Sequence, residues 1–341
     1  MKPLMTETHN QGLVYKKTLG AYHVQVDGRS IPCTLSSRLR KEPVLARAGS
    51  KDRGRRSDGR ERRGRDVKNQ DHNDPVAVGD LVRFAEAQDG TGLIVEVLPR
   101  RNQLARRATG PYNPAHPFEQ VIVANLDQVV PVFAAADPPP HWNLLDRYLV
   151  SAEAAEIPAR ICITKVDLAL GRDGSIEAEL RAAVEDYRRI GYDVVLASAV
   201  TGEGIEELRQ VLAGRTSALL GKSGVGKSSL LNALRPGLGL RVNEISQATG
   251  KGKHTTTHLE MFPLEPGGRV VDTPGVREFG LWDVNPDDLA LFFPEMRPFV
   301  GRCRFGLDCR HDEEPGCAIR KAVMDGEISP RRYQSYCRLK D

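Results

Sequence analysis

The sequence predicts a multidomain α/β protein: an N-terminal oligonucleotide-binding-type β-barrel, a central domain of helices around a parallel sheet, and a small C-terminal metal-binding domain. Short strand patterns separated by Gly, Pro and Asp fill the first hundred residues or so. Strand and helix patterns then alternate from about residue 119 to residue 293. Four of the six cysteines follow residue 300. A chain of 341 residues is long enough for two or three such domains.

The first part combines a polar tail, residues 1–11, with a barrel over residues 12–118. Five β-like segments occur at 12–17, 22–26, 30–34, 80–84 and 91–98. Five strands are the number found in an oligonucleotide-binding barrel, although the spacing also allows another small β-domain.

A strongly basic insertion, residues 40–75, divides the third strand from the fourth. Thirteen Lys or Arg and five Asp or Glu lie between Arg38 and Lys68, a net charge of +8, so the rest of the chain carries −4 of the total of +4. The insertion has too few apolar residues to fold alone, and we expect it to be disordered. It is either an idle solvated loop or an anchor on nucleic acid, and its place within the barrel favours the anchor.

The central domain is expected over residues 119–295. Its helix patterns lie at 142–155, 176–190, 205–212 and 227–234. Its strand patterns lie at 121–124, 129–133, 159–163, 193–197, 217–220 and 269–271. Strict alternation of this kind is typical of a parallel sheet covered by helices.

A phosphate-binding loop joins the strand pattern at 217–220 to the helix pattern at 227–234. Its residues match G-x-x-x-x-G-K-S: Gly221, Lys222, Ser223, Gly224, Val225, Gly226, Lys227 and Ser228. The glycines let the backbone turn tightly and direct N–H groups at phosphate oxygens. We predict that Lys227 binds the β- and γ-phosphates, that the Ser228 hydroxyl coordinates Mg²⁺, and that Ser229 belongs to the same site.

Two further sequence elements predict which base the bound nucleotide carries. Thr164-Lys165-Val166-Asp167 is similar to the Asn-Lys-x-Asp element of GTPases, with Thr164 in place of the preferred Asn. Asp167 is expected to accept hydrogen bonds from N1–H and the amine of guanine; adenine offers neither and would leave the carboxylate unpaired. The Lys165 stem is expected to pack along the base. Ser198-Ala199, after another strand, resembles the element whose backbone N–H meets guanine O6.

The switch elements follow the phosphate loop. Asp272-Thr273-Pro274-Gly275 resembles the Asp-x-x-Gly element, in which Asp272 holds Mg²⁺ through water and the Gly275 N–H contacts the γ-phosphate. Between the loop and Asp272 lies Lys253-His254-Thr255-Thr256-Thr257, and of its three threonines we favour Thr256 as the Mg²⁺ ligand. Val276 stands where Ras-like enzymes have the glutamine that orients water, so intrinsic hydrolysis should be slow. His254 is the nearest candidate to activate water, or else an ordinary exposed histidine.

These motifs occur in circularly permuted order, because the base elements precede the phosphate loop. The same sheet can form, but the chain now leaves it just after the γ-phosphate contact. We therefore expect nucleotide state to move the C-terminal domain relative to the barrel.

The C-terminal domain, residues 296–341, is too short for an apolar core without a covalent or metal link. Cys303, Cys309, His311 and Cys317 form a Cys3His set within fifteen residues, which predicts one structural zinc ion with no open position. Cys337 is an alternative ligand, and free surface cysteines are the simpler alternative.

These motifs together resemble the ribosome small-subunit-dependent GTPase A family. The likeness rests on residues 221–231 (GKSGVGKSSLL), 254–257 (HTTT), 272–280 (DTPGVREFG) and the Cys3His set, with 78–80 and 98–102 similar to that family's barrel. It spans nearly the whole chain except the tail and the basic insertion. The resemblance implies an RNA-binding barrel, a permuted GTPase domain and a zinc domain. It also implies GTP hydrolysis stimulated by the small ribosomal subunit, and a role in the late maturation of that subunit.

The leading hypothesis is a Mg²⁺-dependent GTPase that binds the small ribosomal subunit and its rRNA. One alternative is an RNA-binding assembly factor in which nucleotide only locks a conformation; another is a phosphate-loop ATPase. No run of 18 apolar residues and no apolar leader segment occurs, so we expect a cytoplasmic monomer without a membrane contact.

Overall fold

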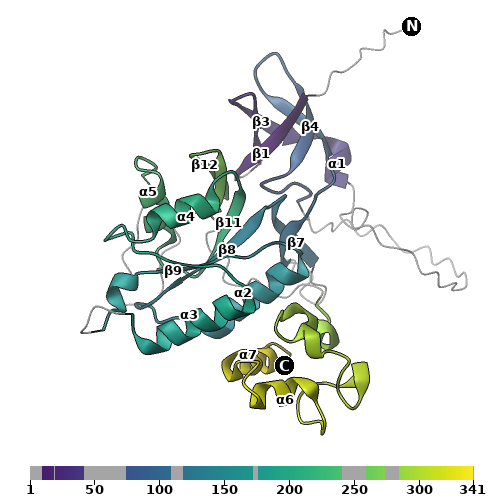
Figure 1. Cartoon of the computed structure of the whole chain (residues 1–341). Helices are drawn as coiled ribbons and strands as arrows, with labels where there is room; N and C mark the ends of the chain where they lie inside the picture. Colours follow the sequence, from purple (N-terminus) through teal and green to yellow (C-terminus); the bar gives the residue numbers. More distant parts are fainter. Residues whose placement is uncertain are drawn as a thin grey trace, which may run out of the picture.

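The computed structural model describes residues 10–18, 20–41, 74–108, 118–171, 176–239, 259–272 and 284–340 (Figure 1). The described part of the chain contains no helix with the length and apolar character needed to cross a membrane. The N-terminal strands and the C-terminal helices lie on different sides of the central sheet (Figure 1).

Five N-terminal strands close into a barrel: β1 (Asn10–Thr18), β2 (Ala21–Val26), β3 (Arg29–Leu35), β4 (Leu81–Glu86) and β5 (Gly92–Val97). Closure follows because β1 pairs with both β2 and β4, while β3 pairs with β5. Alternate side chains point inward, so that Val14, Val24, Ile31, Phe84 and Ile94 form a buried core. The predicted five-stranded barrel is confirmed. A short helix, α1 (Ser37–Lys41), takes in the first two residues of the predicted basic insertion.

A two-stranded hairpin follows the barrel and differs from the predicted arrangement. The pattern at 121–124 was expected to begin the central sheet, but β7 (Phe118–Ala124) instead pairs antiparallel with β6 (Gln103–Ala108). A single bridge, Val78 to Val123, ties the hairpin to the segment before β4. Periodicity along one strand cannot tell which neighbour will pair with it, and so this error was not detectable locally.

The central sheet has the order β10 (Val194–Leu196), β9 (Ile161–Thr164), β8 (Gln128–Ala134), β11 (Thr216–Leu220), β13 (Gly268–Asp272) and β12 (Glu260–Leu264). All neighbours are parallel except β12 and β13. The strand β12 was not predicted; it contains Pro263, a residue that usually argues against a strand.

Helices cover both faces of this sheet. α2 (Trp142–Ala154) and α3 (Ala178–Ile190) share a buried core with one face of the sheet, through residues such as Tyr148 and Tyr187. α4 (Ile205–Leu212) and α5 (Lys227–Leu234) pack on the other face. The chain therefore folds its central part as the predicted parallel sheet between two helical layers.

The barrel and the central sheet are joined edge to edge. β1 pairs with β12 at Lys16 and Glu260, whose side chains also form an ion pair of 2.8 Å. The pairing makes one continuous sheet of eleven strands.

The C-terminal unit, residues 284–340, packs on α2. It contains the helical turns η3 (Pro286–Phe292), η4 (Arg297–Phe299) and η5 (Gly306–Asp308), then α6 (Ala318–Met324) and α7 (Pro330–Lys340). Its small apolar core includes Phe293, Met296, Ile319 and Tyr336, and Val150 of α2 completes that core. A unit this small therefore gains apolar burial from its neighbour.

Candidate nucleotide site and metal cluster

The predicted nucleotide residues lie at the carboxyl ends of β9, β10, β11 and β13. These strands are parallel, so their carboxyl ends share one edge of the sheet. From β8 the chain proceeds to β9 and β10 on one side, whereas β11 lies on the other side of β8. The order reverses there, and open α/β sheets bind ligands in the crevice at such a point.

The phosphate loop adopts a backbone that only glycine accepts easily. Gly224 and Gly226 have φ angles of 84° and 95°, and Gly226 directly precedes the helix α5. A Cβ atom on Gly221 would lie 2.4 Å from the Val132 carbonyl oxygen of β8. The loop therefore passes closely over β8, which supports the predicted role of the three glycines.

Lys227 lies over this loop. Its Nζ donates hydrogen bonds to the carbonyls of Gly221 (2.6 Å) and Lys222 (3.0 Å). Burial lowers the pKa of the Lys227 ammonium, while Asp272 acts to raise it. Ser228 and Ser229 follow in the first turn of α5 and are half-buried. A cation and two hydroxyls thus lie beside the N-terminus of a helix, which is a favourable place for an anion.

Asp272 is the last residue of β13, which lies beside β11, the strand that leads into the phosphate loop. It pairs in register with Leu219 of β11, and its side chain is buried. Its Oδ1 atom has no hydrogen-bond partner among the described residues. Burial raises the pKa of the Asp272 carboxyl, and the Lys227 ammonium offsets this only in part. A buried carboxylate oxygen without a partner is costly, and a cation at this edge would supply one.

Asp167, in the loop predicted to bind the base, also has a buried carboxylate oxygen. It lies in a single helical turn, η2 (Val166–Leu168), directly after β9. Its Oδ1 atom is buried and has no hydrogen-bond partner in the described part of the chain. Two buried acceptors thus lie at or just after the ends of strands on either side of β11, and their pairing with guanine and Mg²⁺ remains a prediction.

Thr164 contacts the phosphate loop. It is buried, and its Oγ1 donates to the Val225 carbonyl (2.5 Å), with the Phe133 carbonyl 3.2 Å away. The hydroxyl carries only one proton, so Val225, the nearer acceptor, takes it in this arrangement. Thr164 therefore braces the base loop against the phosphate loop, and a direct contact between Thr164 and the base remains a prediction.

Lys165 is held by the loop after β8, which no sequence motif marks. Its backbone is left-handed, with a φ of 56°, and its Nζ donates to the Asp137 carbonyl beyond β8. A backbone carbonyl leaves no signal in the sequence, which is why Asp137 was missed.

Ser198 shapes the other predicted base loop. It is fully buried, and its Oγ accepts hydrogen bonds from the backbone N–H groups of Val200 (3.2 Å) and Thr201 (3.1 Å). The next residue, Ala199, lies in the turn that these bonds stabilise. The Val166 N–H also donates to the Ala197 carbonyl, which joins the two base loops.

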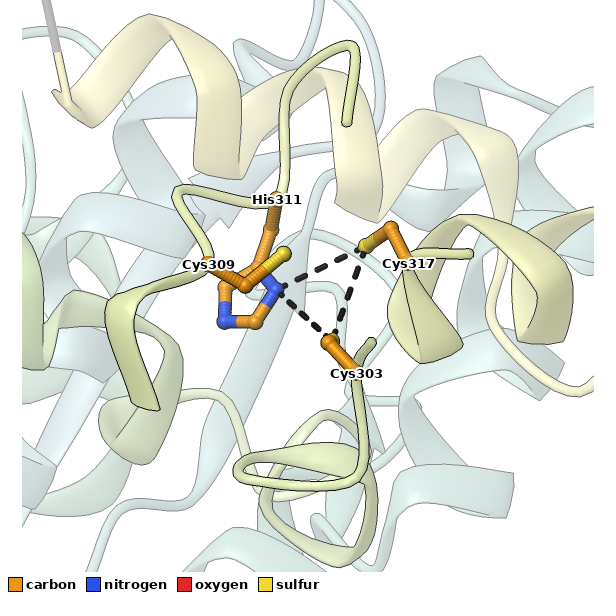
Figure 2. Close-up of side chains that lie close together, drawn as sticks. All are labelled: Cys303, Cys309, His311 and Cys317. Atoms are coloured by element: carbon orange, nitrogen blue, oxygen red, sulfur yellow. Dashed lines mark hydrogen bonds between the residues drawn. The ribbon is translucent and has the colours of Figure 1, made fainter. Parts of the chain in front are cut away.

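The Cys3His set converges on one point (Figure 2). The ligand atoms of Cys303, Cys309, His311 and Cys317 all lie within 4.8 Å of one another, and all four residues are buried. His311 Nδ1 lies 3.4 Å from the Sγ of Cys303 and 3.5 Å from that of Cys317, and these two sulfurs are 3.9 Å apart. Ligands arranged tetrahedrally about zinc would be separated by roughly 3.5–3.8 Å.

Backbone groups also favour thiolates in this cluster. The Ala318 N–H donates to Cys303 Sγ (3.2 Å), and the Arg320 N–H donates to Cys317 Sγ (3.5 Å). Desolvation, with the neighbouring thiols, raises the pKa of Cys309 to about 12, and a bound cation would act in the opposite direction. Cys337 is not part of the group that could hold a metal ion.

Several predicted residues lie outside the described residues: His254, Thr256, Gly275, Val276 and most of the basic insertion. Their predicted roles therefore rest on the sequence alone.

Comparisons with known proteins agree with this geometry. The sequence model of the RsgA GTPase family matches residues 97–282. A relative from Gemmatimonas aurantiaca, named small ribosomal subunit biogenesis GTPase RsgA, is 49% identical over 269 residues, which cover 78% of this chain and 84% of the relative.

Two crystal structures resemble the whole chain. YjeQ from Thermotoga maritima has a TM-score of 0.70 and 32% identity, with 97% of each chain covered. YloQ, described as a circularly permuted GTPase, has a TM-score of 0.66 and 30% identity, with 100% of this chain and 96% of YloQ covered. Because more than half of the chain matches the family model, and relatives this similar match most of its length, the chain belongs to the RsgA GTPase family.

Proposed function

We propose that this protein is a Mg²⁺-dependent GTP hydrolase that acts in late maturation of the small ribosomal subunit, with the subunit stimulating hydrolysis. The observation that carries the nucleotide assignment is a pair of buried oxygens, Asp167 Oδ1 and Asp272 Oδ1, that have no hydrogen-bond partner among the described residues. The ribosomal assignment rests on membership of the RsgA GTPase family and on the names of its relatives.

Guanine selection is assigned to the base loops. Asp167 would accept hydrogen bonds from the N1–H and amine of guanine, and the Ala199 backbone N–H would donate to O6. Lys165, held by Asp137, would lie along the base, and Val166 anchors the turn that presents Asp167. Adenine lacks both donors, so Asp167 would remain unpaired and ATP would bind weakly.

The phosphate side is assigned to Gly221, Gly224, Gly226 and Lys227, with Ser228, Thr256 and Asp272 toward Mg²⁺. The fit rests on the Asp272 oxygen, which has no hydrogen-bond partner in the part of the chain that the structure describes, and on the serine hydroxyls at the start of α5. Bound Mg²⁺ would neutralise phosphate charge. On binding, Lys227 would exchange its two carbonyl acceptors for phosphate oxygens, since carbonyls are the weaker partners of an ammonium.

The Cys3His cluster is assigned to one structural zinc ion. Four protein ligands leave no position open for a substrate or water. The cluster links η5 and the start of α6, so bound zinc would stabilise a unit with a very small core.

We further propose that the barrel and the basic insertion contact rRNA, and that the protein works as a cytoplasmic monomer. A segment of net charge +8 is suited to a polyphosphate backbone. Val276 cannot orient water by hydrogen bonding, so the missing group is assigned to His254 or to the ribosomal subunit.

One experiment tests the proposal against both alternatives. Phosphate release from GTP and from ATP is measured with and without purified small ribosomal subunits. GTP turnover that rises sharply with subunits supports the proposal. Absence of turnover under every condition would favour a nucleotide-locked assembly factor, and a preference for ATP would favour an ATPase.

A further inference from the structure

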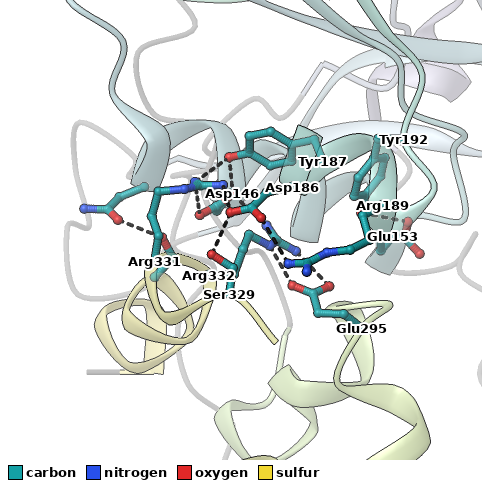
Figure 3. Close-up of polar contacts among 12 residues, drawn as sticks. Asp146, Glu153, Asp186, Tyr187, Arg189, Tyr192, Glu295, Ser329, Arg331 and Arg332 are labelled. Atoms are coloured by element: carbon teal, nitrogen blue, oxygen red, sulfur yellow. Dashed lines mark hydrogen bonds and ion pairs between the residues drawn. The ribbon is translucent and has the colours of Figure 1, made fainter. Parts of the chain in front are cut away.

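A buried cluster of charges joins the C-terminal unit to the helices α2 and α3 (Figure 3). Arg332 of α7 lies at its centre. Its Nη1 donates to Asp146 of α2 (2.6 Å), and its Nε and Nη2 donate to Glu295 (2.7 and 3.2 Å). Tyr187 of α3 donates to the same Asp146 oxygen (2.6 Å). Arg331 donates to the Tyr187 hydroxyl (2.9 Å).

This cluster is unusually dry for so many charges. The side chains of Arg332 and Asp146 are 0% exposed, and that of Glu295 is 8% exposed. The aromatic rings of Tyr187 and Phe293 lie against the Arg332 guanidinium, 5.7 and 4.6 Å from its carbon. Burial alone would lower the pKa of Arg332, but Asp146 and Glu295 raise it, so the guanidinium remains charged.

The cluster is also incomplete. Asp146 Oδ2 and Arg331 Nη2 are both buried without a hydrogen-bond partner among the described residues. Asp146 Oδ2 lies 3.7 Å from Arg331 Nη1, and Arg331 Nη2 lies 4.0 Å from Asp186 Oδ2, so both atoms form ion pairs that are too long to be hydrogen bonds. Buried ion pairs are weak sources of stability compared with apolar packing, and partly satisfied ones are weaker still. These ion pairs therefore contribute little to the stability of the contact between the C-terminal unit and the central domain.

The three segments that meet at Arg332 lead to both sides of the nucleotide site. Glu295 lies on the segment that leaves Asp272 and the predicted second switch. The helix α2 of Asp146 follows the loop whose Asp137 carbonyl holds Lys165. The helix α3 of Tyr187 follows the Asp167 turn. Along the chain, Glu295 follows Asp272 across residues 273–283, which lie outside the described residues, whereas Asp146 and Tyr187 lie on helices that follow the two base-side loops.

We propose that Arg332 is a positioning residue that couples the nucleotide site to the C-terminal unit, because its ion cluster takes a different arrangement in the GDP and GTP states. This inference rests on the proposed function, since it requires two guanine-nucleotide states. Asp146 Oδ2 and Arg331 Nη2 form only long ion pairs, of 3.7 and 4.0 Å, and these are the contacts that shorten when the cluster rearranges. Such coupling is reciprocal: α7 and Glu295 bias the ratio of GTP to GDP affinity by as much as nucleotide biases their contacts.

The test compares Arg332→Met with Lys321→Met. Lys321 belongs to the same unit but forms an exposed ion pair with Asp325, with side chains 74% and 45% exposed. The ratio of the dissociation constants for GDP and a non-hydrolysable GTP analogue is measured, with hydrogen exchange of residues 330–340 in both states. We expect Arg332→Met to change the ratio by about fivefold or more, the lower end of typical coupling, and to abolish the state dependence of exchange. Lys321→Met should behave as the wild-type chain does.

Folding of the variants is checked by bound zinc. If Arg332→Met fails to fold, the triple variant Asp146→Leu, Glu295→Gln, Arg332→Met removes the buried charges together and serves in its place. A lower melting temperature with an unchanged affinity ratio would make Arg332 merely structural and overturn the inference. A wild-type chain that bound no guanine nucleotide would overturn the proposed function as well, so the two failures are distinguishable.

Discussion

The Thr164 hydroxyl donates a hydrogen bond to the Val225 carbonyl, which ties the predicted base loop to the phosphate loop across 61 positions of sequence. The two loops come from different strands, β9 and β11, that are not neighbours in the sheet. Thr164 therefore fixes the spacing between the group that selects the base and the groups that hold the phosphates.

Replacing Thr164 with valine should weaken GDP and GTP binding together. Valine keeps the shape but loses the donor; a hydrogen bond contributes about 1 kcal/mol, which corresponds to roughly a fivefold loss of affinity. Titration calorimetry measures the loss. Thr164→Ser retains the hydroxyl and should bind nearly as well as the wild type. Equal affinities for the valine and serine variants would contradict the bracing role.

Replacing Asp167 with asparagine should change the base preference. The variant keeps one oxygen that can accept from guanine N1–H, but it loses the charge and the acceptor that faces the guanine amine; a hydrogen bond to a charged group contributes about 1.5–3 kcal/mol, so GTP affinity should fall roughly 10-fold or more. Xanthine has a carbonyl where guanine has its amine, and the Asn amide can donate to it. Competition between GTP and XTP measures the change. If the variant preferred GTP over XTP as strongly as the wild type does, the base would not bind at Asp167.

Replacing His311 with alanine should release the metal. Only three ligands would remain, and we expect the loss of bound zinc and of helical signal from α6 and α7. Metal analysis and circular dichroism measure both effects, and a chelator should reproduce them on the wild-type chain. Cys337→Ser is the matched control and should retain one zinc ion. Loss of zinc from that control would make Cys337 a ligand.

Replacing Arg100 with methionine should destabilise the barrel. Its guanidinium donates to both oxygens of Asp80 (2.7 and 2.8 Å), and Asp80 is fully buried. The variant leaves that buried carboxylate without its cation, with the Ala77 N–H (2.8 Å) still donating to it, at a cost of about 3–5 kcal/mol. Urea denaturation measures the free energy of unfolding. Arg83→Met removes an exposed pair with Glu96 and should cost about 1 kcal/mol or less. Similar costs for the two variants would contradict the argument from burial.

Deleting residues 47–68 should weaken binding to small ribosomal subunits and reduce its dependence on salt. The deleted segment carries most of the excess positive charge, and each phosphate contact that is lost removes one released counterion. Binding is measured between about 50 and 200 mM salt. An unchanged affinity and salt slope would show that the segment is idle.

The sequence by itself determined the elements whose chemistry is local. The phosphate loop spans eight consecutive residues, and the Cys3His set spans fifteen, so spacing alone identified both. The five barrel strands and the layered central domain followed from periodicity, because burial on one face repeats every two residues in a strand and every 3.6 in a helix. The circularly permuted order of the motifs could also be recognised in the sequence, because each motif predicted to contact the base is short and contiguous.

Only the tertiary structure decided which distant groups meet. The β6–β7 hairpin, the β1–β12 junction and the Arg332 cluster depend on partners far apart in sequence; Arg332 and Asp146 are 186 positions apart. The Asp137 carbonyl that holds Lys165 belongs to the backbone, which every residue shares. Such contacts are set by how whole elements pack and by the need to pair buried polar groups. No local pattern of residue types encodes them.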